Sequence, residues 1–144
     1  MTVQPRPLSA EAKNFSWLLN RFADQTQGVR EVIAVSADGL MMTMSSGMDR
    51  ARADQLAAIT SAIISLAAGA SRCYGLGETD KVVIDLERGY LLASCISSGS
   101  ALGILADHTA NLGTIAYQAA VFVNRAGPAL TPQLINELRL ALEQ

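Results

Sequence analysis

The sequence predicts an α/β fold, an α/β/α sandwich with a five-stranded, mainly antiparallel sheet. Three observations predict it. Stretches with helical spacing of apolar residues alternate with short β-branched stretches along the 144 residues. Two-residue turn signals, Asp38-Gly39 and Arg88-Gly89, join neighbouring strands and make them antiparallel. Half of the residues are hydrophobic and 17% are charged, which suits one compact core and leaves an apolar excess for another chain to cover.

The first third of the chain is predicted to form a helix and a hairpin. Residues 1–8 contain two prolines and are expected to be a flexible tail. A helix begins after Ser9, a good N-cap residue, and ends before Gly28, a good terminator. Strands at 29–36 and 40–44 follow, because both stretches are apolar and a hairpin turn separates them.

A long helix rich in Ala, Ser and Ile is predicted from residue 49 to residue 72. It carries two stripes. The small stripe comprises Ala57, Ser61, Ser65 and Gly69, and the bulky stripe comprises Leu56, Ile59, Ile63, Leu66 and Ala70. Because the bulky stripe suits the sheet, the small stripe is expected to face another helix, which small side chains allow to approach closely; the alternative is that the small stripe packs on its own sheet. A two-fold axis would place this face against its own copy.

Three further strands are predicted at 81–87, 90–97 and 101–106, joined by short turns. The first alternates apolar and polar residues, as an edge strand would, and the second is apolar on both faces, as a central strand would be. The first and third helices are expected to cover one face of the sheet, and the long helix the other.

A third helix is predicted over residues 109–126, with Asp107 or Thr109 as its N-cap. A short helical extension, residues 128–144, follows it. Thr131 is the expected cap of this last helix, because a proline comes directly after it.

Composition excludes several classes of function. Net charge is −2 with acids and bases interspersed, which argues against nucleic-acid binding. No uninterrupted apolar run reaches the roughly 18 residues that a membrane span needs, so we expect no membrane-spanning helix. Cys73 and Cys95 do not make a disulfide framework, so we expect free buried thiols and a reducing cytoplasm.

No motif indicates an enzyme. The chain lacks a phosphate-binding loop, so it is not itself a GTPase, and Gly75-x-Gly77 is best explained as a turn. We expect no metal and no cofactor, because His108 is the only histidine and has no cluster of ligands around it. A hydrolytic site that joins His108 to Ser94 or Ser97 is an alternative, but no nucleophile-elbow motif supports it.

The charged residues around the predicted long helix and edge strand have ordinary explanations. Asp85 and Glu87 would keep the edge strand from pairing wrongly. Arg50, Arg52 and Arg72 flank the long helix, where exposed arginines are common. An arginine could also act in trans on a GTPase by stabilising charge on the transferred phosphoryl group.

The order of the elements resembles the Roadblock (dynein light-chain/MglB-like) family. The resemblance is carried by the opening helix that ends at Gly28, the hairpin at 32–40, the Ala/Ser-rich helix at 53–71 and the meander at 82–98. It covers about residues 9–126. The Ala- and Arg-rich character is similar to actinobacterial members encoded in conservons, gene clusters that also encode a sensor-kinase-like membrane protein and a small Ras-like GTPase.

This resemblance implies a homodimeric, non-catalytic regulator or scaffold for the GTPase, with a Roadblock-like domain over residues 9–127. It implies a dimer built around the long helices and an edge strand. The family activates GTPases without an arginine finger as well, so a catalytic arginine is not required. The expected dimer or partner interface comprises Arg50, Arg52, Asp54, Ala57, Ser61, Ser65, Ala68, Gly69, Val83 and Asp85.

We expect a cytoplasmic protein that does not insert into a membrane itself and that partners, such as the sensor-kinase-like protein, could recruit there. The alternative is a small-molecule sensor domain with a pocket between the sheet and a helix. The sequence shows few convergent polar groups of the kind that such a pocket needs.

Overall fold

The computed structural model describes residues 7–97 and 99–143, so most of the expected N-terminal tail lies outside the described residues. The elements are α1 (Ala10–Gln25), β1 (Val29–Val35), β2 (Met41–Met44), α2 (Arg50–Tyr74), β3 (Lys81–Leu86), β4 (Gly89–Cys95), β5 (Ala101–Ala106), α3 (Leu112–Ala126), a 3₁₀ turn (Gly127–Ala129) and α4 (Pro132–Leu142).

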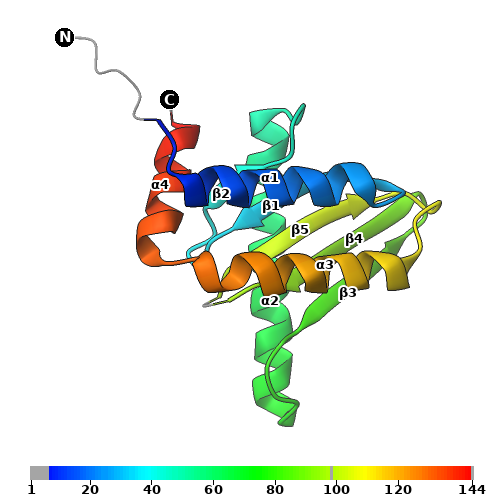
Figure 1. The fold of residues 1–144 in the computed structure, drawn as a ribbon. Coiled ribbons are helices and arrows are strands. Elements are labelled where there is room, and N and C mark those ends of the chain that lie inside the picture. The colour runs from blue at the N-terminus through cyan, green and yellow to red at the C-terminus, as the bar shows by residue number, and fades with distance from the viewer. Residues whose placement is uncertain (1–6, 98, 144) are drawn as a thin grey trace.

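The five strands form one sheet in the order β2-β1-β5-β4-β3 (Figure 1). Every neighbouring pair is antiparallel. The two hairpins β1–β2 and β3–β4 are joined through β5, which lies in the centre between β1 and β4. β2 and β3 are therefore the edges of the sheet, and β3 is the edge that the alternating pattern predicts.

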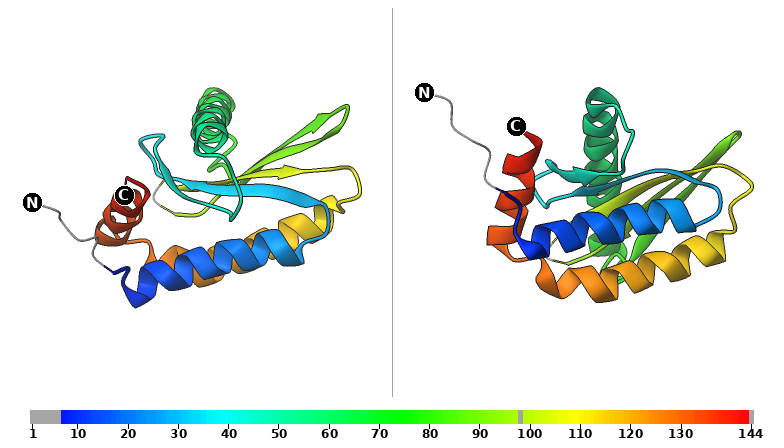
Figure 2. Two further views of the ribbon diagram at one scale, coloured as in Figure 1. Left: turned by 90° about the horizontal axis from the view of Figure 1, so that it is seen from above. Right: turned by 45° about the horizontal axis from the view of Figure 1, so that its top comes forward.

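Helices cover both faces of the sheet, as the sequence predicts. α1 and α3 lie side by side on one face, and α2 crosses the other face (Figure 2). The core is split accordingly. The larger cluster, with Phe15, Leu19 and Phe122, lies between the sheet and the α1–α3 layer. The smaller cluster, with Ile33 and Leu56, lies between the sheet and α2.

Two of the predicted helix caps are confirmed. The Ser9 hydroxyl accepts a hydrogen bond from the Ala12 N–H at 3.2 Å. The Thr131 hydroxyl accepts one from the Leu134 N–H at 3.1 Å, directly before the proline that opens α4. Each cap satisfies an N–H group that the first helical turn would otherwise leave without a partner.

The predicted start of α3 is wrong by three residues. Its cap is Asn111, whose side chain accepts from the Thr114 N–H at 3.0 Å. Asp107 instead accepts from the Thr109 N–H at 2.9 Å and pairs with Arg30 at 2.6 Å. The Thr109 hydroxyl and then the Arg30 guanidinium hold the pKa of Asp107 below its ordinary value. Asp107 is therefore part of a turn that precedes the helix.

α4 packs beside the edge strand β2 and completes the larger core cluster. Leu134 and Leu138 are buried in that cluster. The Glu137 carboxylate accepts from the backbone N–H and the hydroxyl of Ser9, at 2.6 and 2.9 Å, and Arg139 pairs with Asp38 at 3.2 Å. The boundary between domain and extension stays a prediction, but the helix shares the core of the domain.

Candidate interaction surface

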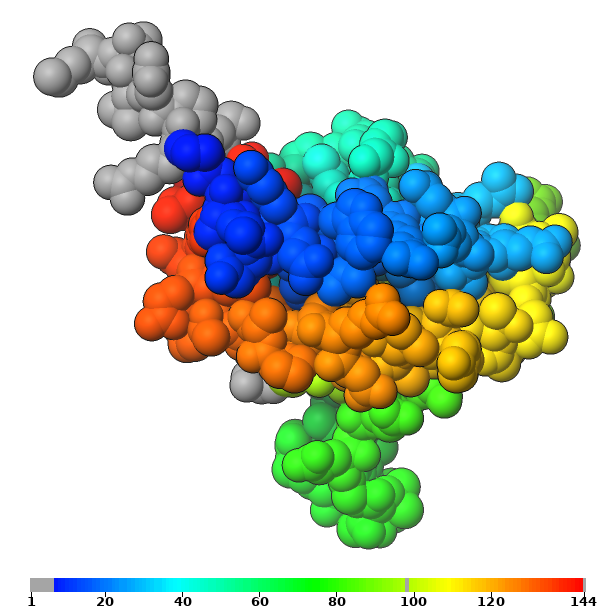
Figure 3. Space-filling model, in the orientation of Figure 1, coloured from blue at the N-terminus to red at the C-terminus, as the bar shows by residue number. Residues whose placement is uncertain are grey.

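α2 has two halves with different surroundings. The N-terminal half lies on the sheet, and its buried residues are Ala53, Leu56, Ala57 and Thr60. All of α2 is described, and past Thr60 none of its residues is buried. This C-terminal half, residues 61–74, begins over the sheet, where Ile63 and Ile64 pack against the smaller core cluster, and its end extends beyond the sheet as a projecting column (Figures 1 and 3). We call it the overhang.

The N-terminal half lies close to the sheet because of its residue spacing and one glycine. The four buried residues follow the 0, 3, 4, 7 spacing of a single helical face. Where the helix crosses β5, the Thr60 hydroxyl lies against Gly103, and a side chain at Gly103 would overlap it. A glycine in the central strand therefore sets the closest approach of helix and sheet.

The predicted division into a bulky inner stripe and a small outer stripe is wrong in its register. Ile59 and Leu66 of the bulky stripe are exposed, and Ala57 of the small stripe is only 2% exposed and packs in the core. A step of four residues turns about 40° further around the helix than one full turn. The small stripe therefore winds from the sheet at Ala57 to solvent at Ser65, so Ala57 cannot contact a partner from here.

The overhang presents an apolar surface to solvent. Leu66 is 75% exposed and Tyr74 is 78% exposed, and Leu76 follows them in the connector to β3. Beside them lies a hollow of about 450 Å³, lined by Ile64, Ala68, Ser71, Arg72, Gly75 and neighbouring connector residues. The sequence analysis missed Tyr74 and Leu76. The sequence pattern that could have identified them is two large apolar residues at the end of a helix, each followed by a glycine, which has no side chain to cover them.

α2 also corrects the expectation about apolar runs. Seventeen residues without charge separate Asp54 from Arg72. By length and composition alone, α2 is a helix that could cross a membrane, and it is the one such helix among the described residues. The earlier expectation counted uninterrupted apolar residues, and the serines and threonine of α2 lower the apolar character only slightly. Protein-covered helices pass the same test, so it identifies an apolar surface and not its occupant.

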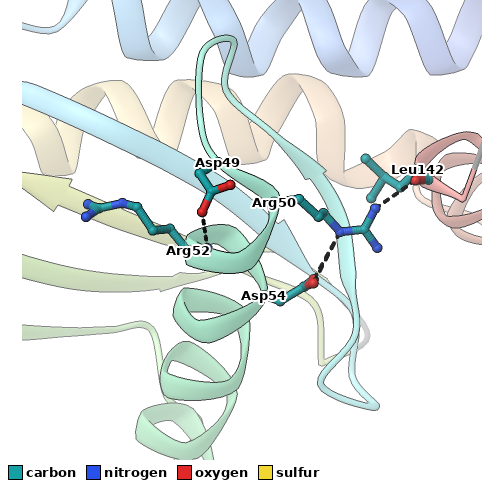
Figure 4. Close-up of polar contacts among 5 residues, drawn as sticks. All are labelled: Asp49, Arg50, Arg52, Asp54 and Leu142. Atoms are coloured by element: carbon teal, nitrogen blue, oxygen red, sulfur yellow. Dashed lines mark hydrogen bonds and ion pairs between the residues drawn. The ribbon is translucent and has the colours of Figure 1, made fainter.

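The charged residues at the start of α2 bind their own chain (Figure 4). Arg50 pairs with Asp54 at 3.2 Å and donates to the Leu142 carbonyl of α4 at 2.7 Å. Arg52 pairs with Glu31 of β1 at 3.1 Å. These contacts connect the N-terminal half of α2 to β1 and to α4, which is an intramolecular role for residues expected at an interface.

The exposed side chains of β3 lie on both faces of the edge strand. Ile84 packs on the α2 side, so Val83 and Asp85 project toward the α3 side, where Val83 is opposite Leu92. The small stripe and the Val83–Asp85 pair thus lie on opposite faces of the sheet. A partner strand paired along β3 would lie close to both faces at once.

His108 has a structural environment. Its Nε2 lies 3.4 Å from the Asp85 carboxylate, and its ring packs edge-on against Tyr90 with ring centres 4.7 Å apart. The Ser97 hydroxyl donates to the Gly127 carbonyl at 3.3 Å. Among the described residues, no hydrogen bond joins His108 to either serine of the hydrolase alternative, so the geometry gives that alternative no support.

The cysteines correct a further expectation. Both are free, but Cys73 is exposed on the last turn of α2, and only Cys95 is partly buried. Burial, and then the Asp80 carboxylate, raise the pKa of the Cys95 thiol. Cys73 is exposed because the last turn of α2 lies beyond the sheet.

The comparisons with known proteins agree with this architecture. A model of the Roadblock/LC7 domain matches residues 15–106, well over half of the chain. The chain belongs to the Roadblock/LC7 family. The matched region contains α1 from residue 15 onward, the whole sheet and α2, whereas α3 and α4 follow it. Comparison with curated protein sequences finds no match.

Solved structures show the same Roadblock fold. A Roadblock/LC7 domain from Streptomyces avermitilis is 29% identical with a TM-score of 0.74, over 78% of this chain and 94% of that one. The gliding protein MglB from Thermus thermophilus has a TM-score of 0.75 at 17% identity, over 88% and 97%. An MglB with a tetrameric arrangement has a TM-score of 0.75 at 16% identity, over 94% and 99%.

Proposed function

We propose that this Roadblock protein is a non-catalytic homodimeric regulator or scaffold. It binds a small Ras-like GTPase and biases the nucleotide state of that GTPase in a cytoplasmic bacterial signalling complex. The observation that carries the proposal is the outer part of the overhang of α2, where the large apolar side chains of Leu66 and Tyr74 are exposed.

The overhang supports self-association. Burying a leucine such as Leu66 in a partner contributes about 1.5–3 kcal/mol per copy. A two-fold axis would let the overhang of one copy cover the overhang and the adjoining hollow of the other, so that both apolar surfaces leave water together. Ser65, Ala68 and Gly69 are small enough for two helices to approach closely there. The tetrameric arrangement of a similar MglB adds support from a related fold.

The role toward a GTPase rests on binding and not on catalysis by this chain. The chain has no phosphate-binding loop. Arg50 and Arg52 already contact Asp54, Leu142 and Glu31, which argues against either as an arginine finger. A dimeric platform can still bias switch segments by contacting one nucleotide state better than the other. The arrangement favours this population-shift mechanism.

Substitution on the overhang tests the dimer. Leu66→Arg places a charge at the centre of the exposed apolar surface, and two-fold pairing would bring two such charges together. We expect the wild type to be a dimer and Leu66→Arg a monomer, as measured by size-exclusion chromatography with light scattering. Leu140→Arg is the matched control, because Leu140 is also an exposed leucine on a helix but lies on α4. A dimeric Leu66→Arg protein would contradict this placement of the interface.

Ser61→Leu, the substitution suggested by the small stripe alone, is a less direct test. The Ser61 side chain lies beside Gly39 in the β1–β2 turn, so a larger residue there meets its own chain. Ser65 is exposed, and it is not among the residues that lie against Gly39 of that turn. Ser65→Leu is therefore the cleaner second variant.

Binding to a small Ras-like GTPase tests the partner. A GTPase from the same gene neighbourhood, loaded with GDP or with a non-hydrolysable GTP analogue, is run with this protein on the same column. Preference for the GTP form would support a regulator and justify a hydrolysis assay. Equal binding to both forms would leave a scaffold. A folded dimer that binds neither form would contradict the proposal.

A cavity provides one observation for the sensor alternative. About 200 Å³ lies between α3 and the β3–β4 hairpin, with apolar walls that include Leu92 and Ile115 and with Lys81 and Asn124 at its rim. Ligand pockets usually enclose about 300–1,000 Å³, so this one suits only a small molecule. A thermal shift on adding nucleotides or metabolites would favour the alternative, and its loss on Ala120→Phe would place the ligand there.

A further inference from the structure

The outer surface of the α1–α3 layer is unusually poor in charge along one of its two helices. α3 contains one charged residue, Arg125, although Tyr117, Gln118, Ala120 and several neighbours on it are exposed. Helix surfaces that face only water usually carry about 25–35% charged residues. This surface lies on the face of the sheet opposite α2, as Figure 2 shows, so the proposed dimer contact would leave it open.

A groove runs between α1 and α3 on this surface. It encloses about 190 Å³, its apolar lining includes Leu18, Phe22 and Val121, and Arg21 and Arg125 lie on its two sides. A second hollow of about 370 Å³ continues along α1 and shares Arg21 with the first. The apolar floor belongs to the groove between the two helices, whereas the second hollow is lined by Trp17 and by polar side chains of α1.

An exposed aromatic residue stands beside this groove. Trp17 is 53% exposed, and the Arg21 guanidinium lies 5.1 Å from the centre of its ring. Stacking restricts Arg21 and leaves its outer N–H groups available, while Arg21 Nε donates to Gln25 at 3.1 Å. Tryptophan and arginine dominate the residues that contribute most to protein–protein binding, so the pair is well suited to anchor a partner.

The charge at the groove is positive. Arg21 and Arg125 form no ion pair with any residue in 7–97 or 99–143. One carboxylate, Asp24, lines the adjoining hollow. The chain as a whole has a net charge of −2, so two arginines without acidic partners across one groove are a local exception. Their complement is a segment with carboxylates on either side of an apolar stripe.

We propose that the groove between α1 and α3 binds an acidic amphipathic helix of a partner protein. The apolar side chains of the helix enter the groove, its carboxylates pair with Arg21 and Arg125, and one side of it packs on Trp17. A groove between two helices matches the helix-in-groove mode of recognition, whereas a flat membrane surface could not reach the recessed floor. This surface goes beyond the function proposed above and does not depend on it.

The single tryptophan of the chain reports binding directly. The probe is a capped peptide of about 18 residues, with Leu at helical spacing and Glu elsewhere, long enough to form a helix. We expect a saturable blue shift of the Trp17 emission. The double variant Arg21→Glu/Arg125→Glu should weaken binding by about tenfold or more, because both contacts become repulsive. Arg88→Glu, an exposed arginine in the β3–β4 turn, should bind as the wild type does.

Three controls decide the proposal. Binding that survives in the double variant, or equal binding of a peptide with Lys in place of Glu, would overturn it. Emission that shifts with vesicles of anionic phospholipid but not with the peptide would assign the surface to a membrane instead. No binding by wild-type protein with a native circular dichroism spectrum would also overturn it. Monomeric Leu66→Arg should retain full binding, so failure of the dimer and failure of this groove are distinguishable.

Discussion

The two halves of α2 share an alanine-rich, apolar character but differ in what lies beneath them. Both contain Ala, Leu and Ile, although the N-terminal half also carries Arg50, Arg52 and Asp54, and the overhang carries the serines. The N-terminal half, with Leu56 and Thr60, is buried against the sheet, whereas the overhang packs on the sheet only at its start, through Ile63 and Ile64, and exposes Leu66 and Tyr74. This difference teaches that an apolar composition predicts that a helix surface will be covered, but not whether its own chain or another chain covers it. The first half is covered by its own chain, and the second is available to another.

The largest expected effect comes from a matched pair of leucines on this one helix. Leu56→Ala should lower the free energy of unfolding by about 2–5 kcal/mol, because it opens a cavity in the core. Leu66→Ala should change that of the monomer by less than about 0.5 kcal/mol, because Leu66 is exposed there. Urea unfolding of both variants in the Ser65→Leu background, which we expect to be monomeric, compares the halves. Equal losses would show that the overhang is buried within a single copy.

A matched pair of glycines gives the next effect. Gly103→Ala should cost about 1–3 kcal/mol, because the new methyl group overlaps the Thr60 hydroxyl and pushes α2 from the sheet. Gly69→Ala should stabilise the monomer by up to about 1 kcal/mol, because alanine is the better helix former and its Cβ would make only an ordinary contact with the Arg72 guanidinium, at 3.8 Å. Thermal unfolding of both in the Leu66→Arg background measures this. A destabilised Gly69→Ala monomer would mean that the overhang packs within the chain.

A smaller change in stability is expected from Thr60, in the N-terminal half of α2. Its hydroxyl is fully buried and has no hydrogen-bond partner among the described residues. Thr60→Val keeps the shape and removes the unpaired polar group, so we expect the free energy of unfolding to rise by about 1 kcal/mol. Ser65→Val, on the exposed side, is the control and should be near neutral in a monomer. A fall in stability with Thr60→Val would show that the hydroxyl is paired in solution, for example to water.

The smallest expected change in stability concerns α4, whose Leu142 carbonyl accepts a hydrogen bond from Arg50 in the N-terminal half of α2. The Ser36 hydroxyl, and then Arg139, hold the pKa of Asp38 below its ordinary value of 3.8. Because the pKa of Asp38 is lower in the folded state than in the unfolded state, its ionised carboxylate stabilises the folded protein at pH values above 3.8. This stabilisation is lost as the pH falls through the pKa of the folded state. Asp38 is exposed, so its loss in Asp38→Asn should cost within about 0.5 kcal/mol at neutral pH. The variant should lose less stability than the wild type between pH 5 and pH 2.5, as followed by urea unfolding. If the two proteins lose stability equally over this range, Asp38 does not contribute to the acid sensitivity.

Much of the architecture could be predicted because it depends on local sequence. Ser9 and Thr131 were identified as caps, since a hydroxyl before a helix satisfies N–H groups only a few residues away. The Asp38-Gly39 and Arg88-Gly89 turns predicted antiparallel neighbours, and the alternation at 81–87 predicted an edge strand. The sequence does not single out Asn111 as the cap, because Asp107 and Thr109 are equally good local candidates, and only the structure shows that Asp107 pairs with Arg30, distant in sequence, in the turn before the helix.

The candidate surfaces divide in the same way. The sequence by itself determined the order and type of the elements, the long apolar helix and the lack of a nucleotide-binding loop, because periodicity, turns and motifs are properties of neighbouring residues. Only the tertiary structure decided where α2 leaves the sheet, so that Ala57 is buried and Leu66 exposed, and that Arg21 and Arg125 meet across one groove. The reason is geometric. Which residues share a surface depends on the length of each element relative to its neighbours and on the angle at which they cross, and neither quantity is encoded within a single element.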